Sequence, residues 1–205
     1  MTPSPLNPTD YQLDALREYI GIGVGKAAAT LNTLVGKHIQ LNVPKVTLQT
    51  HEGFKDHLTS QEKVSFVTLG FKGNLNGNAS IAFDRLSAKR LVSMLVPDTE
   101  ISASEMDAMS ESTLTEVGNI VINAVMGSLS NCFTFDLDYF VPRYHEDVEG
   151  TFAEHQDQET ALIIGETLLT VEDSQIEGEI ILMFLVSDLK ELLKPWQDPS
   201  SKTYA

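Results

Sequence analysis

The chain has 205 residues, a formal net charge of −15 and a single cysteine, Cys132. Nucleic acid and anionic membranes both repel so acidic a protein, so we expect neither as a partner. One cysteine excludes an intrachain disulfide, and residues 1–10 lack the basic start and apolar core of a signal peptide. The longest apolar run, residues 180–186, is too short to span a bilayer. We therefore expect a cytoplasmic protein without membrane insertion.

The first half of the chain predicts a long helix, three strands and a short helix. The long helix covers residues 11–34 and ends at Gly36, a residue type that commonly follows a helix. Pro44 indicates an edge strand or the end of its strand. The three strands are predicted at residues 38–48, 64–72 and 78–83, and the short amphipathic helix at residues 87–95.

Three glycines lie within the first long helix, at Gly21, Gly23 and Gly25. Each costs about 1 kcal/mol relative to alanine in a helix interior, so something should compensate. Gly21 and Gly25 are four residues apart and share one helix face. We expect another backbone to approach the helix closely at these two positions, and internal packing is favoured over a docking partner.

The second half repeats this plan. A long helix ends near Ser130, and a strand over residues 133–141 follows it. Residues 143–159 are acidic and predicted to form a loop. The remaining elements are strands at residues 161–171 and 177–186 and a helix at residues 187–193.

These elements predict an α+β fold. Strands linked by hairpins form a mainly antiparallel sheet, and the two long helices are expected on one face of that sheet. We expect one domain over residues 1–205, built from halves that cover about 9–97 and 102–196.

A polar stripe follows the second long helix. Ser112, Glu116, Asn119 and Asn123 are spaced i, i+4, i+7 and i+11, so a helix aligns them on one face. The opposite face is apolar, as expected for a core-facing helix, and carries Leu114, Val117, Val121, Val125 and Leu129. Taken alone, such a stripe is most simply a solvated helix face.

The stripe has a counterpart 98 residues earlier. Subtracting 98 from Ser112, Glu116, Asn119 and Pro142 gives Asp14, Glu18, Gly21 and Pro44. Each copy thus leads into a Val-Pro pair after the same distance, which indicates an internal duplication. The chemical difference between the copies is that Gly21 occupies the position of Asn119.

The spacing of these residues resembles the signature of the CheC/CheX/FliY phosphatases of bacterial chemotaxis. That signature is Asp or Ser, three residues, Glu, two residues, Asn, twenty-two residues and Pro. Residues 112–142 match it in full, and residues 14–44 match all of it except the Asn. The length and the duplicated layout resemble CheC most closely.

The resemblance implies an aspartyl-phosphate phosphatase that acts on a phosphorylated CheY-like response regulator. It implies that Glu116 docks onto the regulator and that Asn119 orients the attacking water. Ser112 and Pro142 would support the site, and Asn123 is a further candidate contact for the regulator. The first copy would be degenerate, because Gly21 has no side chain to orient water. The resemblance also implies two long helices side by side, each with its polar stripe facing outward.

We expect no cofactor or metal bound by this chain. Its five histidines show no pair at metal-ligand spacing, and it lacks a Walker A loop, a Gly-x-Ser-x-Gly motif and a Cys-x-x-Cys motif. The resemblance places Mg²⁺ on the partner regulator instead.

The alternative function is a non-catalytic binding module. Such a module would regulate a CheD-type deamidase or sequester a response regulator. The intact Glu116–Asn119 pair favours the enzyme.

Overall fold

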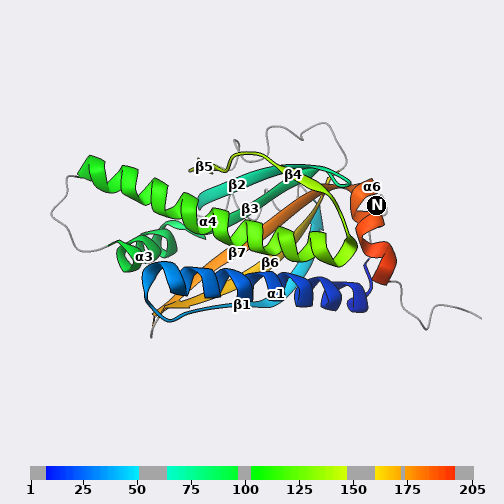
Figure 1. Cartoon of the computed structure of the whole chain (residues 1–205), viewed down its shortest axis with the longest axis horizontal. Helices are drawn as coiled ribbons and strands as arrows, with labels where there is room; N and C mark the ends of the chain where they lie inside the picture. The colour runs from blue at the N-terminus through cyan, green and yellow to red at the C-terminus, as the bar shows by residue number, and fades with distance from the viewer. Residues whose placement is uncertain (1–7, 51–63, 97–102, 147–159, 172–173, 197–205) are drawn as a thin grey trace, which may run out of the picture.

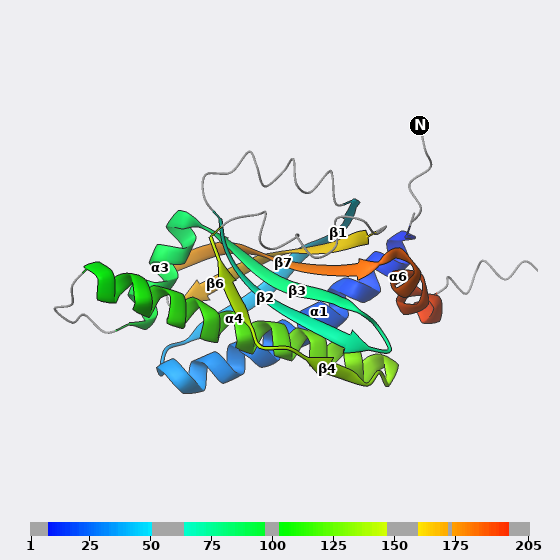
Figure 2. The same ribbon diagram turned by 90° about the horizontal axis from the view of Figure 1, so that it is seen from above.

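A computed structural model of the chain describes residues 8–50, 64–96, 103–146, 160–171 and 174–196 (Figure 1). Two long helices, α1 (Asp10–Val35) and α4 (Ala103–Phe133), lie side by side across one face of a single sheet. The short helices α3 (Arg85–Leu95) and α6 (Val186–Leu193) lie at opposite ends of the molecule (Figure 2). The predicted α+β class and the placement of both long helices on one face are confirmed. Among the helices of the described residues, we find none that could serve as a membrane span.

Helix α1 begins and ends where local chemistry requires it. The Thr9 hydroxyl accepts the backbone N–H of Gln12 at 3.3 Å, and the Gln12 side chain accepts the backbone N–H of Thr9 at 2.9 Å. This reciprocal capping box satisfies backbone donors that have no partner within the helix. At the other end, Gly36 adopts a left-handed conformation with φ of 64° and donates to the Asn32 carbonyl.

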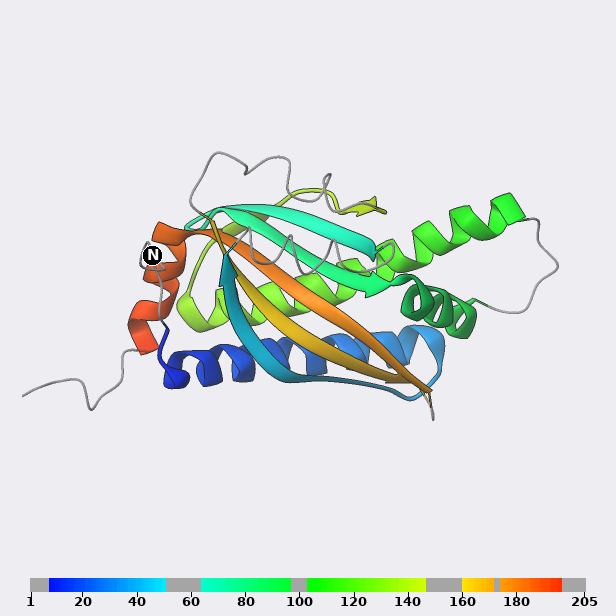
Figure 3. The ribbon, with the colours of Figure 1, turned by 180° about the vertical axis from the view of Figure 1, so that it is seen from behind.

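The sheet is antiparallel throughout its described pairs. Its order is β1-β6-β7-β3-β2-β4, and β5 also pairs with β2 (Figure 3). The strands are β1 (Ile39–Thr50), β2 (Val64–Gly73), β3 (Gly77–Asp84), β4 (Leu137–Tyr139), β5 (Arg143–His145), β6 (Thr160–Val171) and β7 (Ser174–Leu185). Strand β1 lies at an edge, as Pro44 predicted.

The two halves exchange strands. The strand that follows α1 pairs with β6 of the second half, and the strands that follow α4 pair with β2 of the first half. Strands β3 and β7 pair at the centre, where the halves meet. Each half therefore supplies the edge strand that pairs with the hairpin of the other half. Whether residues 1–205 behave as one domain with halves 9–97 and 102–196 stays a prediction.

The predicted strand over residues 133–141 is wrong at residues 133–136 and extends too far, because β4 covers only Leu137–Tyr139. Helix α4 continues through Phe133, and Thr134 then reverses the chain with φ of 55°. Phe133 stacks with Phe135 and lies against Trp196, so its apolar alternation serves an aromatic cluster rather than a strand. Pairing with β2 begins only at Leu137.

The predicted loop over residues 143–159 is also wrong at its start. Residues Arg143–His145 form β5, which resumes the strand pairing with β2. The strand is interrupted at residues 140–142, where the Phe140 N–H donates to the Gly70 carbonyl of β2. The first half has a matching irregularity, a register shift between Asn42 and Lys45 in β1. Both irregularities contain the Val-Pro pair of the repeat, so Pro breaks or bulges the same edge strand in each half. Residues 147–159 lie outside the described residues.

The predicted close approach at Gly21 and Gly25 is wrong, and the contact lies at Gly23. A Cβ built at Gly23 would lie 2.5 Å from the Cα of Val125 on α4. A Cβ built at Gly21 or Gly25 would meet no described atom within 4 Å. The spacing of four residues identified a shared helix face, but that face points away from α4.

Apolar side chains fill both faces of the sheet. The predicted apolar face of α4 is buried, with Leu114, Val117, Val121, Val125 and Leu129 each at most 3% exposed. Each such side chain contributes about 2 kcal/mol by leaving water. A smaller cluster covers the sheet face opposite the long helices and contains Val64, Phe66, Ala82, Leu162, Ile164, Ile181 and Met183.

Candidate functional site

The polar stripe of α4 faces outward. Ser112, Glu116 and Asn123 are exposed, and Asn119 is half-buried at the edge of the stripe. Burial of the opposite apolar face fixes this orientation, because a helix that turned the stripe inward would expose that face to water. The stripe is thus available to a partner along about three helical turns.

Helix α4 approaches the sheet closely beside Asn119. A Cβ built at the buried Gly118 would lie 2.6 Å from the Cβ of Val67 on β2. Only glycine lets the helix backbone come so close to this strand. The backbone that carries Asn119 is therefore held at a fixed distance from β2.

The two asparagines of the stripe are joined by hydrogen bonds. The Asn123 side-chain N–H group donates to the Asn119 side-chain oxygen at 2.7 Å. It also donates to the Asn119 backbone carbonyl at 2.8 Å. One amide thus contacts both the main chain and the side chain of the residue one turn earlier.

Glu116 differs from Asn119 in having a free side chain. Among the described residues, none forms an ion pair or hydrogen bond with its exposed carboxylate. An exposed carboxylate one helical turn from an amide is able to pair with a cation of another protein. The stripe therefore combines one free charge with one held amide.

The edge strand beside α4 carries the proline of the motif. Pro142 is half-buried between β4 and β5, and the preceding Val141 is 79% exposed. The phenol oxygen of Tyr144, two residues later, lies 3.2 Å from both Ser65 Oγ and Glu146 Oε1. Burial raises the pKa of Tyr144, and the nearby carboxylates add to this rise, so the phenol stays neutral. These contacts fix the strand immediately after Pro142 on β2.

The first copy of the motif is assembled in the same way. Asp14, Glu18, Gly21 and Pro44 all line one open groove of about 740 Å³ between α1 and β1. Asp14 is occupied by an ion pair with Arg17 at 3.1 Å. The groove therefore brings together every motif position of this copy. Gly21, which is equivalent to Asn119, contributes no side chain to it.

Comparison with known proteins identifies relatives of this chain. A family model described as chemotaxis phosphatase CheX matches residues 65–166, which contain the whole second copy of the motif. The CheY-P phosphatase CheC of Bacillus subtilis (strain 168) is 27% identical over 166 residues, or 80% of this chain and 79% of that protein.

Solved structures of related folds extend over most of the chain. The crystal structure of Thermotoga maritima FliY covers 94% of this chain and 100% of that chain, with a TM-score of 0.74 and 20% identity. A chain of the CheX-CheY-BeF3-Mg+2 complex from Borrelia burgdorferi covers 82% of this chain and 99% of that chain, with a TM-score of 0.52 and 21% identity.

The chain belongs to the CheC/CheX/FliY family. The resemblance stated from the sequence is thereby confirmed, and so is its fold.

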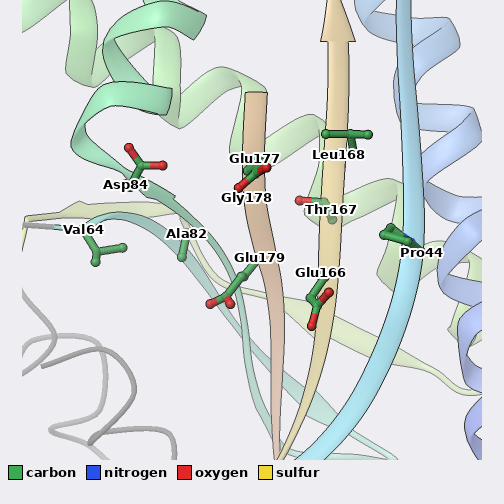
Figure 4. A pocket seen from close by; sticks show the side chains of 10 residues that line it. All are labelled: Pro44, Val64, Ala82, Asp84, Glu166, Thr167, Leu168, Glu177, Gly178 and Glu179. Carbon is green, nitrogen blue, oxygen red and sulfur yellow. The ribbon is translucent and has the colours of Figure 1, made fainter. Parts of the chain in front are cut away.

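An acidic cavity on the other side of this CheC-like sheet is a weaker candidate site. It has a volume of about 410 Å³, and its strands carry Asp84, Glu166, Glu177 and Glu179 (Figure 4). Glu166 pairs with Lys45 at 2.8 Å, and Asp84 caps helix α3. Within the described part of the chain, no group of three or more His, Cys, Asp or Glu side chains could hold a metal ion. Glu166 and Asp84 are therefore already engaged in contacts within the fold.

Sequence reasoning missed two features of the CheC-like site. The contact of Gly118 with Val67 had one visible signal, a glycine directly before Asn119 inside an otherwise regular helix. The bond from Asn123 to Asn119 had only the spacing of four residues as its signal. The sequence alone indicates Asn123 only as a candidate contact for a partner.

Proposed function

We propose that this chain hydrolyses the aspartyl phosphate of a CheY-like response regulator. The observation that carries the proposal is the outward stripe of α4, which holds Glu116 and Asn119 one turn apart on a helix whose other face is buried. The family supports this class of reaction, since its relative from Bacillus subtilis is named a CheY-P phosphatase. The partner is inferred from the same name and from the solved complex of CheX with CheY.

The stripe suits this reaction because the regulator would bring most of the chemistry. Hydrolysis requires a water in line with the phosphorus–oxygen bond and neutralisation of the phosphoryl charge. The regulator would supply the aspartyl phosphate, Mg²⁺ and a lysine. What remains is placement of the water, and an amide can hold water as donor or as acceptor.

The two residues have separate roles in this proposal. Glu116, whose carboxylate is free among the described residues, pairs with the regulator's lysine and fixes α4 in the site. Asn119 then holds the attacking water. Neither residue must ionise or form a covalent bond during turnover. Ser112 and Pro142 act as supports, Ser112 on the helix and Pro142 at the break in the edge strand.

The first copy is proposed to be inactive. Its groove gathers Asp14, Glu18 and Pro44, but Gly21 offers no group to a water. Glu18 is exposed and could still contact a regulator. The chain is thus proposed to contain one active site and one degenerate site.

The test is the decay of a phosphorylated CheY-type receiver in the presence of Mg²⁺. Phosphate release is followed with no addition, with the wild-type chain and with Asn119→Ala. We expect faster decay with the wild type and no acceleration with Asn119→Ala, because misplaced water costs about 100-fold or more. Lack of acceleration by the wild type with several receivers would contradict the proposal.

That negative result would favour the non-catalytic alternative. Isothermal titration calorimetry would then identify which protein the wild-type chain binds. The chain is titrated with a CheD-type deamidase and, separately, with the phosphorylated receiver. Binding of the receiver without turnover indicates sequestration, and binding of the deamidase indicates regulation.

A further inference from the structure

We propose that Asn123 is a positioning residue that fixes the catalytic amide of Asn119. This inference rests on the proposed function and adds a residue to its site. It is carried by the pair of hydrogen bonds from the Asn123 side-chain NH₂ group to the Asn119 backbone carbonyl, at 2.8 Å, and to the Asn119 side-chain oxygen, at 2.7 Å.

The bond selects both the rotamer and the flip of the Asn119 amide. An asparagine amide has an oxygen and an NH₂ group of nearly the same shape, and rotation exchanges them. Donation from Asn123 holds the oxygen of Asn119 toward the C-terminal end of α4. The NH₂ group of Asn119 is thereby left to face a docked partner. The group that contacts the water is then an N–H donor, and the water keeps a lone pair for attack on phosphorus.

Exposure makes this bond weak in the free protein and stronger in a complex. Asn123 is exposed and Asn119 half-buried, so water competes for the same groups. A regulator docked on the stripe excludes that water, and a hydrogen bond gains strength in the lower dielectric. The arrangement is therefore most rigid at the moment when the attacking water must be aligned.

The first copy of the repeat supports treating the two asparagines as a unit. Subtracting 98 from Asn119 and Asn123 gives Gly21 and Gly25, so both amides are missing from that copy. Packing does not demand glycine at either place, because a Cβ there would meet no described atom within 4 Å. The copy without the water-holding amide thus also lacks the residue that would hold it.

Substitutions at Asn123 separate positioning from partner contact. Asn123→Asp keeps the shape but replaces the donor with an acceptor, which would draw the NH₂ group of Asn119 inward. We expect Asn123→Asp and Asn123→Ala to lower kcat about tenfold or more while KM for the phosphorylated receiver stays unchanged. Asn123→Gln retains a donor within reach and should recover most of kcat. Asn131→Ala, at an exposed asparagine near the end of α4, is the matched control.

A change confined to KM would overturn the inference, because it would make Asn123 a contact for the regulator. An unchanged kcat in both Asn123→Asp and Asn123→Ala would overturn it as well. If the wild type turns over no receiver, the proposed function fails instead, and the inference is tested by a structural readout.

That readout is the rotamer population of the Asn119 side chain in solution. Three-bond NMR couplings across the Cα–Cβ bond report whether Asn119 keeps one rotamer. Because water competes for this bond in the free protein, we expect one preferred rotamer in the wild type and more complete averaging among rotamers in Asn123→Ala. Equal couplings in both proteins would overturn the inference, whatever the phosphatase assay shows.

Discussion

Gly118 and Val67 set how closely helix α4 approaches the sheet. A Cβ at position 118 would lie 2.6 Å from the Cβ of Val67 and 2.7 Å from its Cγ1. The other half exchanges the residue types of this pair. Ile20, at 118−98, faces Gly165, at 67+98, with 3.9 Å between the Ile20 Cγ2 atom and a Cβ built at Gly165. In one half the glycine is on the helix, and in the other it is on the strand.

Gly118→Ala should therefore destabilise the protein and disturb the site. Val67 is β-branched and its Cβ is fixed to the strand, so it cannot swing aside, and the helix must lift instead. We expect a loss of about 1–2 kcal/mol, since overpacking outweighs the gain in helix propensity. The free energy of unfolding is measured by urea titration, and phosphatase kcat should fall because Asn119 moves with the helix.

Gly127→Ala in the same helix is the matched control. A Cβ there would have no described atom within 4 Å. This variant should gain about 1 kcal/mol of stability and keep its activity. Equal stability of Gly118→Ala and Gly127→Ala would show that α4 does not depend on its contact with Val67.

A second prediction concerns the crossing of the two long helices. A Cβ at Gly23 would lie 2.5 Å from Val125 Cα and 2.8 Å from the Ala124 carbonyl oxygen. Because these atoms are backbone, the helices must separate, and we expect Gly23→Ala to cost about 3 kcal/mol. Gly25→Ala, whose new methyl group faces open space, should be neutral or stabilising. Thermal unfolding of both variants would check this, and the opposite order would place the helix contact elsewhere.

The glycines also show which features of the fold could be predicted from the sequence alone. Periodicity was enough to predict α1 and α4, their buried faces and the outward stripe, because the 3.6-residue repeat follows directly from burial of one face. It could not say which glycine met α4, since that depends on the rotation of one helix against another. Only the assembled pair of helices reveals the role of Gly23.

The edge strands were predicted less well for a related reason. Phe133 and Phe135 follow the alternation of a strand, but tertiary packing against Trp196 takes them into an aromatic cluster. The strand exchange between halves was likewise invisible, because hairpin turns indicate only local pairs. The family signature, in contrast, is a fixed spacing within the chain, and it was readable without any structure.

A third prediction uses the N-terminal cap of α3. The Asp84 carboxylate accepts the backbone N–H groups of Leu86 at 2.7 Å and Ser87 at 2.9 Å. Burial alone would raise the pKa of Asp84, but these bonds, the Ser87 hydroxyl and Arg90 together outweigh it and hold that pKa below its usual value. A lowered folded-state pKa stabilises the protein above the unfolded pKa of about 3.9, and this stabilisation is lost as pH falls through the folded value.

Asp84→Ala should thus cost about 1 kcal/mol at pH 7 and progressively less below pH of about 4. The free energy of unfolding of wild type and variant is compared by urea titration at both pH values. Asp84→Asn keeps a capping oxygen without the charge, so its deficit at pH 7 should be smaller than that of Asp84→Ala. A deficit of Asp84→Ala that does not change with pH would mean that the charge contributes nothing to the cap.

A fourth prediction distinguishes the two copies of the motif. Glu116 and Glu18 are both exposed and occupy equivalent helix positions. Glu116→Ala should raise KM for the phosphorylated receiver at least about tenfold, because the docking charge is lost. Glu18→Ala should change turnover little, since Gly21 offers no group to water. Equal loss of activity from both variants would contradict the single-site proposal.

A fifth prediction restores the amides to the degenerate copy. In an Asn119→Ala background, Gly21→Asn together with Gly25→Asn should return part of the phosphatase activity. A Cβ at either position would meet no described atom within 4 Å, and the groove already gathers Asp14, Glu18 and Pro44. Gly21→Asn alone should recover less, because its amide would be unfixed. In the restored protein Glu18→Ala should abolish the recovered activity, although it is neutral in the wild type.

The measurement is phosphate release from the same receiver, with stability checked by urea titration so that an unfolded variant is not misread. Arg17 is the reason that we expect only partial recovery. It pairs with Asp14 at 3.1 Å and lies in the same groove, where its charge would repel the regulator's lysine near Glu18. Adding Arg17→Ala should therefore increase the recovered activity. No recovery in any of these folded variants would mean that the first copy differs from the second by more than its two missing amides and one competing cation.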